Sequence, residues 1–407
     1  MQRRLICLLT GQPIPQLLTV RHLLCGDGLD EPPMLLLGVT PAMRAGYKSF
    51  MEALAVEPNP FTGQKVMLEL ANDDLPAEVH RSLKEQVDEW CEGPGEWLVA
   101  MTGGTRLMAM GLERLARELG ARMLYIDQSR PMELLDVETG ARETIAHQLS
   151  LPEFFLAHGF DVRMPAVSRQ MLARERAARI CVLRREPLTY QNTKSNDDRS
   201  NARKRLREGK EPDTAIVAVN DADLREALLD AFPEVEWNGP YLAGGFSREL
   251  GEFLTGGWLE TFVFCLMARN QEALGIRDVR MNVMFQARDT RVKNEIDICF
   301  MRGSYLHAIE CKTGMPASRT AVDSLYKIES VIHQTRAMHT RASLVTTHPN
   351  VYVEQNSRPM PPNVKPELRE RAAFNNWRLV APHQLDQLAQ CRSIDEEVSH
   401  LTQMLFG

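Results

Sequence analysis

The 407-residue sequence has no paired-cysteine motif and no long apolar run. Its eight cysteines are scattered through apolar stretches without a C-x-x-C pair, which argues against zinc or redox work and favours thiols in a reducing cytoplasm. The short apolar stretch after the charged N-terminus, residues 5–9, predicts a β-strand, and no stretch is long enough to span a membrane. A net charge of −6 argues against a general nucleic-acid coating protein, so we expect any nucleic-acid contact to be local.

Two nucleotide-binding motifs are also missing. Neither G-x-G-x-x-G nor G-x-x-x-x-G-K-[ST] occurs in the N-terminal part of the chain, so a dinucleotide coenzyme or ATP is not expected there. What is present is the composition of a soluble globular protein, with 44% apolar and 25% charged residues. The length exceeds one ordinary hydrophobic core and predicts two or three domains.

Residues 1–150 alternate short apolar strands with helices. The predicted strands begin near residues 5, 34, 66, 96 and 122, and a helix follows each of the first four. Strands with so few polar residues are buried on both faces, as in a parallel sheet that helices cover. We therefore predict an α/β, Rossmann-like domain over residues 1–150.

Two loops of this domain are rich in glycine and threonine. The sequence T-G-Q-P follows the first strand at residues 10–13, and M-T-G-G-T-R follows the fourth at residues 101–106. Ligands of such sheets bind at the carboxyl ends of the strands, and glycine N–H groups beside a helix start suit a phosphate. The alternative is that the glycines serve only the geometry of a strand-to-helix turn.

The same two loops carry a resemblance to a known family. An opening strand that ends in T-G-Q-P, together with V-A-M-T-G-G-T-R-L-M ahead of a helix, resembles the CARF domain, the sensor of cyclic oligoadenylates in type III CRISPR defence. The resemblance implies that one group of residues cradles the phosphates and bases of the activator. These residues are Thr10, Gln12, Thr102, Gly103, Gly104, Thr105 and Arg106.

Residues 294–312 read as a β-hairpin that concentrates charged side chains. Strand alternation places successive residues of its first strand on opposite faces. One face carries Glu295, Asp297 and Cys299, and the other carries Ile296, Ile298 and Phe300. On the second strand, Glu310 and Lys312 share one face, while Ile309 and Cys311 point into a core. The hairpin is therefore expected to have one apolar face and one face loaded with charge.

The turn sets which of these residues meet. We expect a tight turn at Arg302-Gly303, which places Phe300 opposite Tyr305. With that register Glu295 lies opposite Glu310, and Asp297 lies diagonally from Glu310.

Facing carboxylates repel one another, so this arrangement predicts a divalent cation between them. Oxygen ligands suit Mg²⁺ or Mn²⁺, which polarise a phosphate and lower the pKa of bound water. A strongly apolar helix at residues 256–268, with Glu260 near its start, precedes the hairpin. The alternative is an exposed strand whose polar face carries these charges by chance.

The order of Glu260, Asp297, Glu310 and Lys312 resembles the PD-(D/E)XK nuclease motif in its E-x-K form. The resemblance implies that Asp297 and Glu310 hold the metal with help from Glu260. Glu295 is a further acid and the Cys311 carbonyl a further ligand, while Lys312 positions the attacking water. Lys327, on a helix expected at residues 321–338, is a secondary candidate.

The segments around the hairpin complete the predicted domain plan. Residues 151–245 are expected to be a connector with its own small fold, and residues 246–407 an α/β/α nuclease domain. The connector holds a polar, basic stretch at residues 187–213. Such a stretch is usually a solvated loop or exposed helix face, and the alternative is a mobile basic arm that guides a nucleic-acid strand.

Together, the two resemblances match the CRISPR ancillary nucleases of type III systems. Membership implies a homodimer that encloses one cyclic tetra-adenylate and a metal-dependent nuclease that cuts DNA or RNA. Three rivals stay open: a constitutive repair or restriction nuclease, a CARF-type DNA-binding regulator, and a sensor domain that slowly cleaves its own activator.

Overall fold

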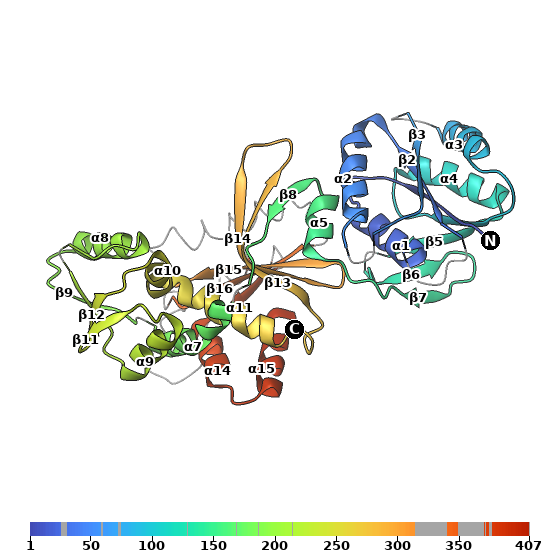
Figure 1. The fold of residues 1–407 in the computed structure, drawn as a ribbon. Helices are drawn as coiled ribbons and strands as arrows, with labels where there is room; N and C mark the ends of the chain where they lie inside the picture. The colour runs from blue at the N-terminus through green and yellow to red at the C-terminus, as the bar shows by residue number, and fades with distance from the viewer. Residues whose placement is uncertain are drawn as a thin grey trace.

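The computed structural model describes most of the chain. The described residues are 1–25, 31–57, 60–71, 75–127, 129–167, 169–185, 187–213, 215–313, 340–348, 370, 372–373 and 377–406. The helix expected at residues 321–338, with Lys327, lies outside these residues. Figure 1 shows the N-terminal domain as one body beside a larger one.

The N-terminal domain is built on a seven-stranded sheet of order β3-β2-β1-β4-β5-β6-β7. Strands β1 to β5 pair in parallel, and β6 and β7 extend the sheet as an antiparallel hairpin. The bounds are β1 (Arg3–Leu8), β2 (Met34–Val39), β3 (Gln64–Glu69), β4 (Glu96–Ala100), β5 (Arg122–Ile126), β6 (Glu133–Asp136) and β7 (Arg142–Thr144). The predicted parallel sheet is confirmed, and the closing hairpin is an addition to it.

Helices cover both faces of this sheet, as the apolar strands require. Helices α1 (Ile14–Leu24) and α2 (Arg44–Leu54) lie in one hydrophobic cluster with the sheet. Helices α3 (Pro76–Trp90) and α4 (Arg106–Glu118) lie in the other. The short helix η1 (Pro41–Met43) leads into α2.

The second large sheet has six strands in the order β17-β16-β15-β14-β13-β8. Strands β8, β13, β14 and β15 are antiparallel, whereas β15, β16 and β17 are parallel. The bounds are β8 (Phe160–Arg163), β13 (Arg277–Ala287), β14 (Lys293–Arg302), β15 (Tyr305–Lys312), β16 (Thr340–Thr346) and β17 (Trp377–Val380). The predicted hairpin is β14–β15, at the middle of the sheet.

A long helical run packs on this second sheet. It consists of α10 (Arg248–Glu252), the π-helical turn η2 (Phe253–Gly257) and α11 (Trp258–Arg269). The expectation of no membrane-length segment needs correction, because residues 248–269 are long and apolar enough to cross a membrane. The apolar window of that run is 72% buried inside the protein, so it is a core helix.

The C-terminal helices close the same core. Helices α14 (Pro382–Gln390), α15 (Ile394–Leu401) and the final turn η4 (Thr402–Phe406) join the cluster that α11 forms with the sheet.

The remaining connector residues form a small layer of their own. Four short strands run in the order β11-β12-β10-β9, with bounds β9 (Thr189–Gln191), β10 (Ile216–Ala218), β11 (Glu236–Asn238) and β12 (Tyr241–Gly244). Two helices precede these strands, α6 (Arg169–Ala173) and α7 (Glu175–Arg184). Helix α8 (Asn196–Arg207) carries the basic stretch, and α9 (Ala222–Ala231) follows β10.

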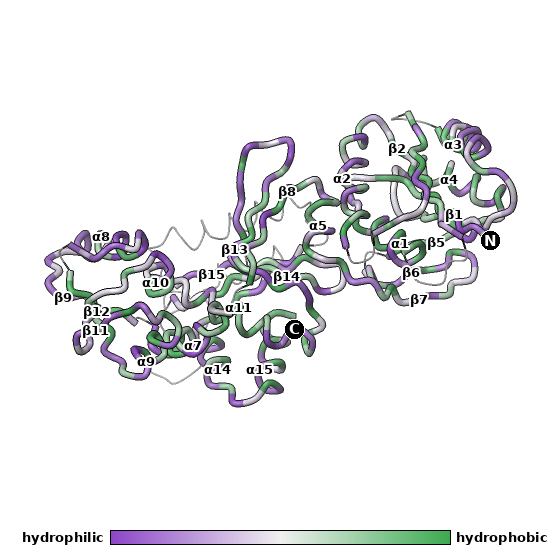
Figure 2. Tube along the Cα trace, in the orientation of Figure 1, coloured by the Kyte–Doolittle hydropathy of each residue, from purple (hydrophilic) through white to green (hydrophobic). Residues whose placement is uncertain are grey.

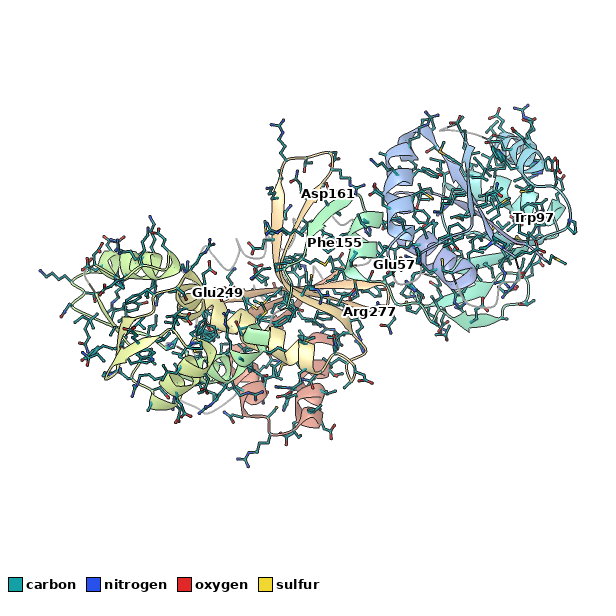
Figure 3. The ribbon with its side chains drawn as sticks, viewed as in Figure 1. Glu57, Trp97, Phe155, Asp161, Glu249 and Arg277 are labelled. Atoms are coloured by element: carbon teal, nitrogen blue, oxygen red, sulfur yellow. The ribbon has the colours of Figure 1, made fainter. Side chains whose placement is uncertain are left out.

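The two bodies meet at α5 (Leu151–Ala157) and β8. The rings of Phe155 and Phe160 both pack against Phe285 of β13, with centroids 5.3 and 5.4 Å apart. Phe155 and Asp161 are labelled at this junction in Figure 3. One hydrophobic cluster therefore runs from the N-terminal sheet through α5 to the second sheet.

Candidate active site

The β14–β15 register decides which charged residues meet, and it differs from the expected one. Arg302 pairs with Tyr305, so the turn is Gly303-Ser304, and Gly303 takes a positive φ of 60°. Glycine adopts that conformation without strain, which fixes the turn one residue later than predicted. Continuing the register sets Asp297 opposite Glu310, rather than diagonal to it.

The hairpin is also less one-sided than predicted. Ile298, Phe300, Ile309 and Cys311 lie in the core with α11, as expected. Most of the other face is equally apolar, because it packs against α5 and β8 in a second cluster. Its members include Ile296, Cys299, Met301, Leu306 and Ala308. The carboxylates of the hairpin are therefore confined to the end away from its turn.

At that end, two carboxylates and a lysine are in contact. Lys312 Nζ lies 2.6 Å from Oε1 of Glu310 and 3.9 Å from Oδ2 of Asp297. The backbone N–H of Cys311 donates to the same Asp297 oxygen at 2.8 Å. Both carboxylates are buried, with 7% and 3% of Asp297 and Glu310 exposed. The Cys311 thiol is a core group, since burial raises its pKa well above the ordinary value.

Helix α11 brings a third carboxylate to this end of the hairpin. Burial raises the pKa of Glu260 to about 7, and the nearby Asp297 carboxylate adds to the rise, while Lys312 opposes it. The raised pKa means that the ionised form of Glu260 is disfavoured here, first by burial and then by the neighbouring carboxylates. The structure thus brings together Glu260, Asp297, Glu310 and Lys312, as the sequence predicted.

A polar hollow of about 520 Å³ opens beside these side chains. Its wall includes Glu260, Glu295 and Lys312. Glu295 is exposed and faces the hollow, whereas Asp297 and Glu310 are buried behind it. A phosphodiester has room to approach the cluster from this side.

Several wall residues were not among the predicted site residues, among them Arg207 of α8, Glu252 of α10 and Asn282 of β13. Asn282 has a positive φ of 54°, which a side-chain-bearing residue adopts at a cost of about 1–3 kcal/mol. Its neighbours pair as Met281 with Ile298 and Val283 with Ile296, so Asn282 lies across from Asp297. The signal in the sequence that could have pointed to Asn282 is a polar residue within a long β-strand.

The donor set fits a hard divalent cation. Carboxylates and a backbone carbonyl are the ligands that Mg²⁺ and Mn²⁺ prefer, and the raised pKa of Glu260 marks a place where positive charge would be stabilised. Within the described ranges, no three His, Cys, Asp or Glu side chains converge as a ready-made ion site. Lys312 instead occupies an oxygen of Glu310.

The predicted sensor residues lie together at the carboxyl edge of the N-terminal sheet. A Cβ at Gly103 would stand 3.1 Å from Cγ2 of Thr10, so the two glycine-rich loops are neighbours. The Thr10 hydroxyl is within 3.1 Å of both the carbonyl and the N–H of Gln12, which closes that loop. Arg106 is exposed at the start of α4.

Several of these residues also stabilise the local structure of the loops. The Thr102 hydroxyl accepts from the Ile126 N–H at 2.7 Å, and the Thr105 hydroxyl caps α4 by accepting from the Met108 N–H at 3.2 Å. Gly103 and Gly104 have positive φ values of 131° and 74°. The turn geometry therefore requires these glycines, whatever ligand the loops hold.

A second hollow, of about 910 Å³, begins at the first of these loops. Thr10 and Gly11 line one side, the start of α2 another, and residues 157–161 and 287–289 the far side. Arg288 links the parts: it pairs with Glu52 of α2 at 2.5 Å and with Asp161 of β8 at 2.9 Å. The edge of the sensor loops is thus tied to the β13–β14 turn.

The central hairpin, the preceding apolar helix and the carboxylate–lysine cluster define a nuclease of the PD-(D/E)XK class. Residues 247–380 match the family model described as "Card1-like, endonuclease domain". These residues are therefore similar to a Card1-like endonuclease domain, and the predicted nuclease activity class is confirmed. A search of curated proteins found no match to the chain.

Solved structures extend the likeness to the whole chain. Can2 from Sulfobacillus thermosulfidooxidans in complex with cyclic tetra-adenylate is 17% identical, with a TM-score of 0.70 and 100% of both chains covered. Protein VC1899 from Vibrio cholerae is 16% identical, with a TM-score of 0.73, and the match covers 99% of this chain and 98% of that one. A type III CRISPR defence DNA nuclease activated by cyclic oligoadenylate is 16% identical, with a TM-score of 0.53 over 94% of this chain and 48% of that one.

At these identities the likeness shows the fold. The predicted α/β fold class is confirmed, with a CARF-like Rossmann domain first and a restriction-endonuclease-like α/β/α domain last. The predicted domain boundaries and the roles of individual site residues stay predictions.

Proposed function

We propose that this protein is a metal-dependent nuclease that a cyclic oligoadenylate, cyclic tetra-adenylate first of all, switches on in type III CRISPR defence. The observation that carries the proposal is the buried contact of Asp297, Glu310 and Lys312 in an endonuclease domain. The sensor half is supported by the fold shared with Can2, whose structure holds cyclic tetra-adenylate. The substrate is DNA, single-stranded RNA or both.

Each residue of the site has a defined task in this proposal. Asp297 and Glu310, with Glu260 and the Cys311 carbonyl, hold Mg²⁺ or Mn²⁺, which when bound polarises the scissile phosphate and supplies hydroxide near neutral pH. Lys312 leaves the carboxylate of Glu310 to orient the attacking water and to stabilise negative charge on the phosphate oxygens. Glu295, exposed at the rim, is a candidate further ligand.

The sensor loops would bind the activator. Thr10, Gln12 and residues 102–106 offer N–H groups, hydroxyls and the Arg106 guanidinium to its phosphates. We propose a homodimer in the cytoplasm, in which two such edges enclose one ring. The continuous core at α5 and the Arg288 link give ligand binding a physical route to the nuclease sheet.

The test is cleavage of supercoiled plasmid and of single-stranded RNA with Mn²⁺ or Mg²⁺, with and without cyclic tetra-adenylate. Glu310→Gln removes a charge from the site while keeping its shape, and Glu272→Gln, an exposed acid of the same domain, is the matched control. We expect activator-dependent cutting by the control and at least a 100-fold loss in Glu310→Gln.

Two other outcomes would overturn parts of the proposal. Cutting that ignores the activator would favour a constitutive repair or restriction nuclease and remove the sensor assignment. Sequence-specific DNA binding that is equal in both variants, without cutting, would favour the CARF-type regulator.

A further inference from the structure

We infer that helix α8 is the surface along which a single nucleic-acid strand reaches the active site, and that Arg207 holds a substrate phosphate at its end. The inference rests on the proposed nuclease function, and it gives a role to the basic stretch of the connector. Residues 194–210 carry seven basic and three acidic side chains, and Figure 2 draws α8 as strongly hydrophilic.

Three arginines of α8 form one row. Arg199, Arg203 and Arg207 are four residues apart, so they share one helix face, and all three are exposed. Each step along the row rises about 6 Å, and the whole row spans about 12 Å. At about 3.4 Å per nucleotide along one strand, this length corresponds to three or four phosphates.

The positive charge of these three arginines is not neutralised by a neighbouring carboxylate among the described residues. Arg199 contacts the Thr193 hydroxyl at 3.5 Å, Arg203 lies 5.7 Å from the centre of the Tyr190 ring, and Arg207 donates to the Thr255 hydroxyl at 2.8 Å. In the described part of the chain, no carboxylate oxygen lies within 4.0 Å of these three guanidinium groups. Arg205, on another face of the same helix, is instead neutralised by Asp213 at 2.8 Å.

The helix is held firmly, as a guide for a strand must be. A capping box at Ser195 and Asp198 fixes its start, and Leu206 is buried. At its end, a Cβ built on Gly251 would come within 1.7 Å of the Leu206 carbonyl oxygen, so glycine alone permits this approach to α10. Figure 1 shows α10 beside one end of α8, and α10 continues through η2 into α11.

The end of the row reaches the site already described. Arg207 lines the same hollow as Glu260 and Lys312. A row of positive side chains therefore leads to an acidic centre. The arginines attract the phosphates of the strand, and the reacting phosphate is left to the bound metal ion and Lys312. A helix face that was merely solvated would not need its last arginine in the wall of the active site.

The first test is binding, measured without cleavage. Full-length protein in EDTA is titrated into fluorescein-labelled single-stranded DNA and RNA of 20 nucleotides, and anisotropy is followed from 50 to 200 mM salt. The double variant Arg199→Gln/Arg203→Gln is compared with Arg205→Gln, which changes the neutralised arginine of the same helix.

We expect the double variant to lower the slope of log affinity against log salt by about 1.4, since each lost contact to a single strand removes about 0.7. Its affinity at 50 mM salt should fall about tenfold or more for one or both strands, and Arg205→Gln should bind like wild type. Equal binding by the two variants would overturn the inference.

Cleavage is the second test. Arg207→Gln should raise KM for the strand about tenfold or more, and an unchanged KM would overturn the role of Arg207. If wild-type protein binds strands but cuts nothing, the proposed function fails, while the binding comparison still decides the role of α8.

Discussion

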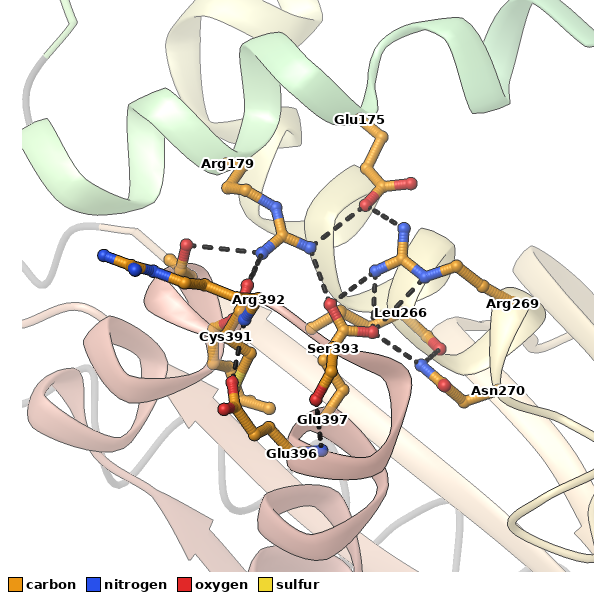
Figure 4. Close-up of polar contacts among 12 residues, drawn as sticks. Glu175, Arg179, Leu266, Arg269, Asn270, Cys391, Arg392, Ser393, Glu396 and Glu397 are labelled. Carbon is orange, nitrogen blue, oxygen red and sulfur yellow. Dashed lines mark hydrogen bonds and ion pairs between the residues drawn. The ribbon is translucent and has the colours of Figure 1, made fainter.

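Glu397 holds together the part of the protein that positions α11, so its replacement makes a demanding test of the structure. Its carboxylate accepts from Arg179 of α7 at 2.8 Å, from Arg269 of α11 at 2.7 Å and from Asn270 at 3.0 Å (Figure 4). The side chain is 5% exposed, and Glu175 is a second acid beside the same two guanidinium groups. Glu397→Gln keeps the shape but leaves the two arginines with one carboxylate.

The expected cost follows from the burial. Removing one member of a buried ion pair costs about 3–5 kcal/mol, and the side chains of Arg179 and Arg269 are 23% and 33% exposed, which favours the lower end. At about 2–4 °C per kcal/mol for a body of this size, the midpoint of nuclease-domain unfolding should fall by about 6–12 °C. Asp395→Asn, an exposed acid in the first turn of α15, is the control and should cost less than about 1 kcal/mol.

The pH dependence of stability provides a second test of the role of Glu397. Burial alone would raise the pKa of Glu397, but the hydrogen bonds from Arg269, Asn270 and Arg179 outweigh it and leave the pKa below the ordinary value. Its stabilising contribution is then complete above the unfolded pKa, about 4.3, and is lost as pH falls through the folded value. Calorimetry of wild-type protein and of Glu397→Gln from pH 7 to pH 3 should show that the difference between their unfolding midpoints shrinks in acid. A difference that is absent at pH 7, or that grows in acid, would refute the reasoning.

Three further predictions concern the sensor half and its link. Hydrogen bonds from His147 and Ser150 outweigh burial and lower the pKa of Glu153, so wild-type protein should gain stability over Glu153→Gln above about pH 4.3 and lose that gain in acid, as urea titrations would report. Gly103→Ala should destabilise by about 1–3 kcal/mol in thermal melts, because its φ is 131° and the new Cβ would meet the Leu8 carbonyl oxygen at 2.8 Å. Arg288→Gln should change the melting midpoint by no more than about 2 °C, since the ion pairs of Arg288 with Glu52 and Asp161 are partly exposed. The same variant should lower activator-stimulated cleavage several-fold without changing activator binding. Full stimulation would contradict the proposed link between the sensor and the nuclease sheet.

Much of the fold could be predicted from the sequence because local patterns agree with the global arrangement. The five parallel strands of the N-terminal sheet are mostly apolar, and the motif residues Glu260, Asp297, Glu310 and Lys312 follow one another in the order of the nuclease motif. Helix α11 packs on β13, β14 and β15, which brings Glu260 to the charged end of the hairpin.

The hairpin register was wrong by one turn position for a definite reason. Arg302-Gly303 and Gly303-Ser304 are both plausible tight turns, and strand alternation alone does not choose between them. The positive φ of Gly303 and the pairing of Phe300 with His307 settle it in the structure.

Arg207 and Asn282 were missed for another reason. Each reaches the active-site hollow only through tertiary packing, one through the glycine contact of α8 with α10 and the other through a left-handed residue inside β13. The sequence held only weak signals for them, a polar residue within a long strand and the basic stretch at residues 187–213, and neither signal places a side chain in the hollow.

The edge strand β8 has a consequence for how this protein can be divided. It lies about 85 residues before α10 in the chain, yet it pairs with β13, an 11-residue strand of the nuclease sheet, through Met284, Phe285, Gln286 and Ala287. A fragment that starts at residue 246 would leave one side of β13 with unpaired N–H and C=O groups, the kind of edge that recruits other chains. The smallest self-contained nuclease unit therefore begins before residue 160, and the connector layer is an insertion between its first strand and the rest of its sheet.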